Sequence, residues 1–311
     1  MKILICGLGS IGLRHAKNLL KLGYKDIILF TSREIKENKL KKFKIFNSLN
    51  KALKEKPNVA LICNSTHLHE DTLIKCIKNK TNIFVEKPVG FNYKKLTKLS
   101  NLIEKKKINN MVGYMMRFHP AILKIKKLLK NNVIGKIYHF SSIWGEYLPN
   151  WHRNENYKNS YASNKSMGGG VSLTLSHDLD LSCYLFNKVK KVEVIKNNIN
   201  SLNIRAESSV DFLVSFENNI NGFIHLDYLQ KDPIRIVSIY GTEGKIEFNY
   251  YKNQIQINKN GGKKKIFFRK FKRNDLFVNE MKYVLKSIRD KKKMSPNIIE
   301  SIKLLKNFKL I

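Results

Sequence analysis

Three glycines near the N-terminus constrain this chain more than any other feature. The segment "KILICGLGSIG" runs from an apolar strand into Gly7, Gly9 and Gly12, which have the spacing G-x-G-x-x-G. Between a strand and a helix, the first glycine permits the tight turn, the second admits a pyrophosphate and the third lets the helix pack on the strand. The amides of Ser10 and Ile11 then face the phosphates. The sequence predicts a dinucleotide site here, and a plain glycine turn is the alternative.

The first third of the chain alternates short apolar strands with helical patterns. Helices are expected at about 11–22, 47–55, 69–79 and 93–107, and strands at 2–7, 26–32, 59–65, 82–88 and 110–116. Regular alternation predicts βαβ crossovers and therefore a parallel sheet with buried strands. Residues 1–118 are thus predicted to form an α/β domain of the doubly wound Rossmann type, which binds NAD(P).

Beyond residue 118 the pattern changes. A helix is expected at 121–131, a strand at 136–147 and one helix through 168–186, after an irregular polar segment. Seven strands joined by short turns follow between 189 and 269, and helices close the chain at 275–289 and 295–308. Strands joined by short turns predict a mostly antiparallel open sheet with one face free to pack on another subunit. Residues 119–311 are therefore expected to form a second, α+β domain.

Composition narrows the classes of function. The formal net charge is +35, but the lysines are scattered over every segment, so nucleic-acid binding is not expected as the primary role. No uncharged apolar run reaches about 18 residues, and the N-terminus enters the glycine turn directly, so neither a membrane span nor a signal peptide is indicated and a cytoplasmic location is expected. The four cysteines lie far apart without a C-x-x-C pair and are interpreted as small buried hydrophobes.

The end of the second strand bears on the type of dinucleotide. An NAD-specific fold has an acidic residue about 20 residues further on, where it binds the ribose 2′-hydroxyl. This chain has Thr31, Ser32 and Arg33 there, and Glu34 comes one or two positions late. Because hydroxyls and a guanidinium suit a 2′-phosphate, NADP is favoured over NAD. Arg33 as an ordinary surface arginine is the alternative.

Two further strand ends supply polar residues to the same edge of the sheet. The loop "CNSTHLHEDT" contributes Asn64, Ser65 and His69 as cofactor contacts, and no metal is expected because its histidines lack a third ligand at useful spacing. In "FVEKPVG" the apolar strand ends at two charged residues and a proline, which has no backbone N–H to donate to a neighbouring strand. Glu86 is added to the cofactor contacts. Lys87 is predicted where a nicotinamide ring would lie, and its ammonium can stabilise an alkoxide as hydride leaves; a solvated lysine is the alternative.

Five motifs follow one another along the chain: "GLGSIGLRH", "NSTHLHEDTLIKCI", "NIFVEKPVG", "GYMMRFHP" and "GGGVSLTLSHDLD". In this order and spacing they resemble the motifs of the glucose-fructose oxidoreductase / inositol dehydrogenase (Gfo/Idh/MocA) family, and the resemblance covers nearly the whole chain. The resemblance implies an NAD(P)-dependent oxidoreductase with a Rossmann domain and a C-terminal domain whose open sheet makes dimer or tetramer contacts. It also implies that Lys87 is catalytic and that its bond to Pro88 is commonly cis.

His177 is the second catalytic candidate. Three glycines precede the helix that carries it, and a neutral imidazole can accept the proton of a hydroxyl. A lone histidine on a helix is more often structural, but "GGG...H..D" resembles the second catalytic motif of the family. Many members carry an aspartate a few residues before this histidine. Thr174 stands three before it here, with Asp178 and Asp180 just after, so whether a carboxylate assists His177 is left open by the sequence.

The substrate side is predicted from the motif "GYMMRFHP" and from a polar, aromatic segment at 147–170. Tyr114 and Arg117 are expected to face the crevice, and a structural ion pair is the alternative for Arg117. The segment resembles a sugar-binding lid, in which aromatic faces stack on rings and basic groups reach acidic ones, or else it is a surface loop or subunit contact. Its candidate residues are Trp151, His152, Arg153, Tyr157, Tyr161 and Lys165, and Thr174 is added as a hydrogen-bonding residue.

Together these observations predict hydride transfer between nicotinamide and a secondary alcohol or ketone of a sugar, nucleotide sugar or polyol. The alternative is a dinucleotide-binding protein without catalysis, which senses redox state or acts as a scaffold in a sugar-biosynthesis pathway. A homodimer or homotetramer through the C-terminal sheet is expected from the family resemblance.

Overall fold

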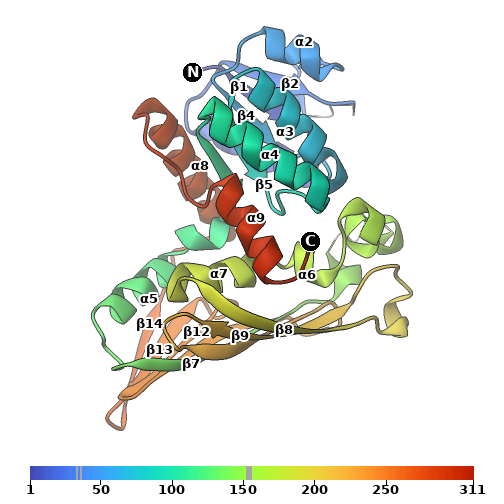
Figure 1. Cartoon of the computed structure of the whole chain (residues 1–311). Coiled ribbons are helices and arrows are strands. Elements are labelled where there is room, and N and C mark those ends of the chain that lie inside the picture. The colour runs from blue at the N-terminus through green and yellow to red at the C-terminus, as the bar shows by residue number, and fades with distance from the viewer. Residues whose placement is uncertain (33, 36, 152–155) are drawn as a thin grey trace. The chain divides into compact units, whose positions relative to one another are not determined.

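The computed structural model describes residues 1–32, 34–35, 37–151 and 156–311 (Figure 1). The chain divides into two units. Unit 1 comprises Met1–Tyr114, Phe277–Lys303 and Ile311, and unit 2 comprises Met115–Leu276 and Leu304–Leu310. The C-terminal helices thus contribute residues to both units, and the predicted domain ranges of 1–118 and 119–311 stay a prediction.

Unit 1 contains a six-stranded parallel sheet in the order β3-β2-β1-β4-β5-β6. Every residue of the strands β1 and β4 is buried, as expected of parallel strands covered on both faces. The Rossmann class predicted from the alternation is confirmed. The strands are β1 (Ile3–Cys6), β2 (Ile27–Phe30), β3 (Lys44–Phe46), β4 (Val59–Ile62), β5 (Asn82–Glu86) and β6 (Asn110–Gly113).

The helices of unit 1 bury apolar residues on one side. In α1, for example, Ala16 and Leu19 are fully buried three positions apart. Helices α3 and α4 lie side by side (Figure 1). The helices are α1 (Ser10–Lys21), α2 (Leu49–Lys54), α3 (His69–Lys78), α4 (Tyr93–Lys106), and parts of α8 (Arg273–Arg289) and α9 (Ile298–Asn307).

Residues far along the chain are tied to strand β6. The amide of Val112 donates to the Pro296 carbonyl at 2.8 Å, and the amide of Ile298 donates to Asn110 Oδ1 at 2.7 Å. These bonds hold the segment before α9 against β6, an edge strand of the parallel sheet. Most of α8 and the start of α9 belong to unit 1, which the order of predicted elements did not indicate.

Unit 2 contains an eight-stranded sheet in the order β14-β13-β12-β11-β7-β10-β9-β8. Strands β7 and β10 pair in parallel, and all other neighbours pair antiparallel, so the mostly antiparallel sheet is confirmed. The strands are β7 (Ile137–Gly145), β8 (Val189–Asn197), β9 (Ser209–Phe216), β10 (Asn221–Asp227), β11 (Ile234–Gly241), β12 (Gly244–Asn249), β13 (Gln254–Lys259) and β14 (Gly262–Phe267).

One face of this sheet is covered and the other is open. The covering helices are α5 (Pro120–Lys130), α6 (Val171–Thr174) and α7 (His177–Phe186) (Figure 1). Rings of Phe140 and Phe186 pack with centroids 4.7 Å apart on the covered face, whereas Leu213 and Ile195 are 66% and 65% exposed. Alternate residues along β9 explain the contrast, because successive side chains of a strand point to opposite faces. Within the described residues, no helix is both long and apolar enough to cross a membrane.

Candidate active site

In the glycine turn, close packing requires two of the three glycines, and the other one faces open space. Gly7 has φ +92°, and a Cβ on it would lie 2.7 Å from the Cα of Asn64. A Cβ on Gly12 would lie 2.0 Å from the Gly7 carbonyl oxygen. A Cβ on Gly9 would meet no described atom within 4 Å. Packing therefore requires the first and third glycines, and only the second leaves room for a group outside the chain, as the fit of a pyrophosphate demands.

Helix α1 presents bare amides at its start. Gly9 is its N-cap, and no side chain caps the helix. The first turn holds no acidic residue, and it begins with the exposed Ser10 and the partly exposed Ile11. Unsatisfied amides and the helix dipole favour an anion at such an end. The geometry of this turn thus fits a dinucleotide phosphate.

The end of β2 offers few described groups for the adenosine ribose. Thr31 is buried, and its amide donates to the Phe46 carbonyl at 3.1 Å. Ser32 is exposed, whereas Arg33 lies outside the described residues. The exposed hydroxyl of Ser32 fits either the ribose hydroxyl of NAD or the phosphate of NADP.

His69 connects two loops at the carboxyl edge of the sheet. One ring nitrogen lies 2.8 Å from the Pro88 carbonyl and the other lies 2.9 Å from the Asn64 carbonyl. Burial lowers the pKa of His69, so at neutral pH the ring donates to one of the two oxygens. Asn64 donates to the Thr72 hydroxyl at 3.0 Å, and Ser65 is exposed. His69 is only 1% exposed, so its visible role is to join these loops, and its predicted cofactor contact stays a prediction.

The turn that carries Lys87 is held on both sides of the lysine. Glu86 accepts from His15 at 2.8 Å, and the carbonyl of Pro88 faces His69. Further along, Glu70 Oε1 accepts from the amides of Phe91 and Asn92 at 2.9 and 3.0 Å. The peptide bond between Lys87 and Pro88 is cis, as the family resemblance implies. The partly exposed Lys87 is therefore attached to a turn whose backbone is tightly restrained.

His177 lies at the start of α7 in unit 2 and is 3% exposed. The predicted helix through 168–186 is two helices in the structure, because α6 ends at Thr174 and α7 begins at His177. The Trp144 ring lies beside His177, with centroids 6.1 Å apart. Thr174 is buried, and burial raises the pKa of the buried Tyr228 hydroxyl. A break between two helices thus places the imidazole at a helix start.

Both aspartates that follow His177 are paired with arginines. Asp178 accepts from the Ser142 hydroxyl at 2.7 Å and forms a buried ion pair with Arg235. Asp180 accepts two bonds from Arg117, at 2.8 and 2.7 Å. The structural ion pair considered for Arg117 is therefore present, and its predicted substrate contact stays a prediction.

The described part of segment 147–170 contains the short 3₁₀ turns Leu148–Asn150, Tyr157–Asn159, Tyr161–Ser163 and Lys165–Met167. Trp151 packs edge-on against Tyr228 at 5.4 Å, and the Tyr157 hydroxyl donates to the Leu202 carbonyl at 3.0 Å. Tyr161 is partly exposed and Lys165 is exposed, whereas Tyr114 of unit 1 is fully buried. His152 and Arg153 lie outside the described residues.

The triple glycine has a packing role that sequence reasoning missed. A Cβ on Gly169 would lie 2.1 Å from the Tyr161 carbonyl oxygen. Gly170 has φ +103°, and a Cβ there would lie 2.4 Å from the Glu207 carboxylate. These glycines therefore let the helix start pack against the turns of the 147–170 segment.

Sequence reasoning also missed two charged residues with buried side chains. Arg235, 2% exposed, stacks over Trp144 with its guanidinium carbon 3.7 Å from the ring centroid. Glu280 is 0% exposed in α8. The available signal was a charge inside a largely apolar stretch. Arg235 is the only charge in "PIRIVSIY", and Glu280 lies in "LFVNEMKYVL", which also contains Lys282. Neither stretch indicates which residue pairs with its buried charge.

Comparisons with known proteins agree with the two units. Residues 1–114 match the model of an oxidoreductase family with an NAD-binding Rossmann fold, and residues 122–247 match the GFO/IDH/MocA C-terminal domain. The chain is similar to myo-inositol 2-dehydrogenase of Thermotoga maritima, with 33% identity over 144 residues, or 44% of this chain and 42% of that protein. It thus spans less than half the length of that relative.

Two further likenesses extend over more of the chain. It is similar to levoglucosan dehydrogenase of Pseudarthrobacter phenanthrenivorans, with 22% identity over 267 residues, or 76% of this chain and 68% of that protein. A solved levoglucosan dehydrogenase in complex with NADH superimposes with a TM-score of 0.87 at 17% identity, covering 98% of this chain and 94% of the other. This second likeness establishes the fold.

Proposed function

The chain belongs to the Gfo/Idh/MocA family of oxidoreductases, and we propose that it transfers a hydride between a nicotinamide dinucleotide and a secondary alcohol or ketone of a sugar, nucleotide sugar or polyol. One observation carries the proposal. Strands β1, β4 and β5 are neighbours in register, with Cys6 opposite Ile62 and Ile62 opposite Val85. The glycine turn, the Asn64 loop and Lys87 therefore leave the sheet at one carboxyl edge, where such folds bind ligands.

Residues of this edge would hold the dinucleotide. The open space at Gly9 and the bare amides of α1 suit its pyrophosphate. When bound, the nicotinamide ring supplies or accepts the hydride. The proposed set is Gly7, Gly9, Ser10, Ile11, Gly12, Thr31, Ser32, Arg33, Asn64, Ser65, His69 and Glu86.

Lys87 and His177 are the proposed catalytic residues. The Lys87 ammonium would donate a hydrogen bond to the reacting oxygen and stabilise the negative charge that develops on it. The His177 imidazole would accept the hydroxyl proton during oxidation and return it during reduction. Asp178 and Asp180 are paired to arginines. Thr174, three residues before His177, is therefore proposed as a hydrogen-bonding group for the substrate.

The substrate class is proposed from the relatives and from the 147–170 segment. The two curated relatives are named for myo-inositol and levoglucosan, which suggests a ring with several hydroxyls. Aromatic and basic side chains around that segment suit such a ring and an acidic substituent. The proposed contacts are Tyr114, Arg117, Trp151, Tyr161, Lys165 and Thr174.

We propose NADP as the preferred dinucleotide, because the hydroxyls of Thr31 and Ser32 and the guanidinium of Arg33 suit a 2′-phosphate. Mass spectrometry of the protein as purified identifies any retained dinucleotide, and titration of each reduced form by fluorescence compares affinities. Tighter binding of NADPH supports the proposal. At least equal affinity for NADH contradicts it.

Three broader expectations are also proposals. Residues 1–118 would bind the cofactor, and residues 119–311 would bind substrate and form subunit contacts. A homodimer or homotetramer would use the open face of the unit 2 sheet. The cytoplasm is the proposed location.

The decisive experiment replaces Lys87 by Met and, separately, His177 by Asn. Each variant should bind the dinucleotide as the wild type does and lose turnover by at least about 100-fold, because an acid–base group supplies about that factor. The exposed Lys94→Met on α4 is the matched control. Near-normal turnover in either catalytic variant would remove that residue from the mechanism.

The non-catalytic alternative has its own outcome. If the wild type binds a dinucleotide tightly but no sugar, nucleotide sugar or polyol changes its absorbance, a sensor or scaffold explains the chain better than an enzyme.

A further inference from the structure

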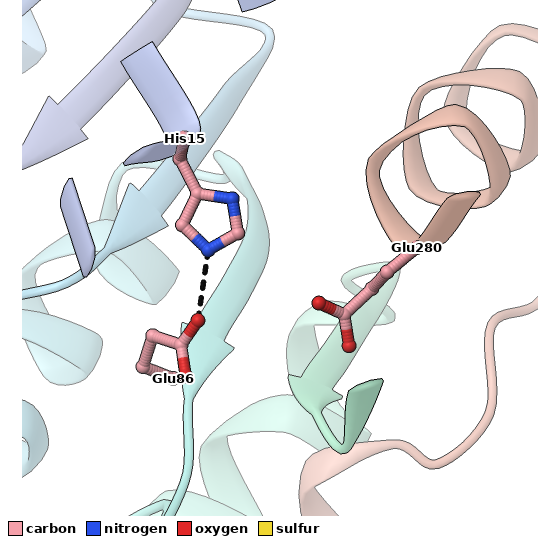
Figure 2. Close-up of side chains that lie close together, drawn as sticks. All are labelled: His15, Glu86 and Glu280. Carbon is pink, nitrogen blue, oxygen red and sulfur yellow. Dashed lines mark hydrogen bonds and ion pairs between the residues drawn. The ribbon is translucent and has the colours of Figure 1, made fainter. Parts of the chain in front are cut away.

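Three buried titratable side chains meet inside unit 1, from segments far apart in the sequence. His15 belongs to α1, Glu86 ends β5, and Glu280 belongs to α8. One ligand-type atom of each lies within 4.8 Å of the others, and His15 Nε2 lies 2.8 Å from Glu86 Oε1. Figure 2 shows the Glu280 carboxylate directed toward this pair from the opposite side. We name these three residues the HEE cluster.

The surroundings of the HEE cluster are mainly apolar. The His15 ring is edge-on to Phe84 and Phe277, with centroids 5.2 and 5.9 Å apart. The Arg14 guanidinium stacks over Phe277. Burial raises the pKa of the Cys63 thiol, and the negative charges of Glu86 and Glu280 raise it further. Glu86 and Glu280 therefore both affect the same buried thiol group.

Burying these groups needs a reason beyond packing. Charged side chains lose their hydration when buried, and apolar residues of similar size would serve stability at least as well. What the HEE cluster does provide is a connection. It joins the helix of the glycine turn, the glutamate directly before Lys87, and a helix about 190 residues further along the chain.

We propose that His15 and Glu280 are positioning residues for Lys87. An N–H of His15 donates to the Glu86 carboxylate, and the Glu280 carboxylate packs within 4.8 Å of this pair. Glu86 is thereby fixed on one side of Lys87, as His69 fixes Pro88 on the other. The HEE cluster acts on catalysis only through the placement of Lys87, so its catalytic consequence rests on the proposed function.

A metal ion is the competing interpretation of the HEE cluster. His15 Nε2 lies at hydrogen-bond distance from Glu86, so an ion would have to bind at Nδ1, which has no partner among the described residues. Nδ1 and the Glu280 carboxylate would then be its ligands, fewer than the three or four protein ligands of a zinc site. This ligand count favours a hydrogen-bonded cluster over a metal site.

The kinetic test compares His15→Leu with His15→Gln, because glutamine retains an N–H donor and leucine does not. His15→Leu should lower kcat by at least about 10-fold with KM and dinucleotide Kd nearly unchanged, since small misplacement of a catalytic group costs up to about 100-fold. His15→Gln should recover most of that loss. Glu280→Gln should lower kcat less, and the exposed Glu104→Gln should not change it.

A second measurement does not depend on turnover. The full-length protein is treated with a small amine-reactive ester, and the acylation rate of Lys87 is read from its peptide by mass spectrometry. His15→Leu and Glu280→Gln should change this rate, whereas His15→Gln and Glu104→Gln should not. If no substrate is turned over but this pattern holds, the proposed function fails and the positioning of Lys87 stands.

Three results would overturn the inference. One is an unchanged Lys87 acylation rate in a folded His15→Leu protein. Another is a weaker dinucleotide Kd in His15→Leu with kcat unchanged, which would assign His15 to cofactor binding. The third is stoichiometric metal in the purified wild type that is lost in Glu280→Gln.

Discussion

The turn around Lys87 and the helix start around His177 are restrained by different kinds of interaction. Around Lys87, several restraints involve the backbone: Glu70 binds two amides and His69 faces the Pro88 carbonyl. Around His177, the restraints are buried ion pairs between side chains, Asp178 with Arg235 and Asp180 with Arg117. The proposed cofactor side thus depends on steric and backbone constraints, and the proposed substrate side depends on compensated charge.

The largest effect should follow from removing a charge next to His177. Arg235→Met leaves the Asp178 carboxylate buried without its partner, and we expect the free energy of unfolding to fall by about 3–5 kcal/mol. Urea unfolding followed by circular dichroism measures it. The double variant Arg235→Met, Asp178→Asn should recover part of the loss. A single-variant loss below about 1 kcal/mol, the size of an exposed pair, would contradict the ionic description of this region.

The glycine turn should respond to sterics instead. Gly12→Ala places a Cβ 2.0 Å from a backbone oxygen, and we expect a loss of about 2–3 kcal/mol of unfolding free energy. Gly9→Ala meets no described atom, so its stability should fall by only about 0.5–1 kcal/mol, because alanine is a poorer N-cap than glycine. Its dinucleotide Kd should nevertheless weaken by at least about 10-fold, or about 1.4 kcal/mol. Fluorescence titration checks the affinity, and equal destabilisation by both alanines would contradict the assignment.

The same contrast explains what the sequence could predict. Glycine spacing, the proline after Lys87 and the alternation of strands and helices are local signals, and they located the Rossmann sheet and the turn of Lys87. Strand β3 was missed because it is three residues long and mostly exposed, without an apolar run. The break between α6 and α7 was missed because neither Leu175 nor Ser176 is a helix breaker.

The partners of buried charges lay beyond local signals. Asp178 and Arg235 are 57 residues apart, and Arg117 and Asp180 are 63 apart. No periodicity links such positions, because only the long-range packing of unit 2 brings them together. The same holds for Glu280, whose neighbours His15 and Glu86 come from the other end of the chain.

A smaller effect is expected where the ion pair is less buried. Arg117 makes a two-point contact with Asp180 that a lysine cannot reproduce, so Arg117→Lys should lower the unfolding free energy by about 1–2 kcal/mol. The exposed Lys158→Arg is a control for exchanging the two cations. If Arg117→Lys is as stable as the wild type, the pair does not restrain α7.

Among the ionic sites, the smallest effect should appear on the unit 2 sheet, where His225 lies between two aspartates. Hydrogen bonding to Asp227 and also to Asp211 raises the pKa of His225 to about 9, although its partial burial opposes this. Because the folded pKa lies above the unfolded one, the stabilisation is fully present below about pH 6.5 and is lost as the pH rises through about 9. Solvent screens this half-buried group, so we expect a loss on the order of 1 kcal/mol.

Urea unfolding on either side of that pH window measures the loss, and His225→Gln should remove most of the difference. A wild type whose stability rises across the window, or a variant that keeps the full pH dependence, would show that His225 is not held by its aspartates. We expect the stability contributed by the ion pairs of Arg235, Arg117 and His225 to decrease in that order, because the charges are progressively less buried. Either result would contradict this order for His225, the most exposed of the three.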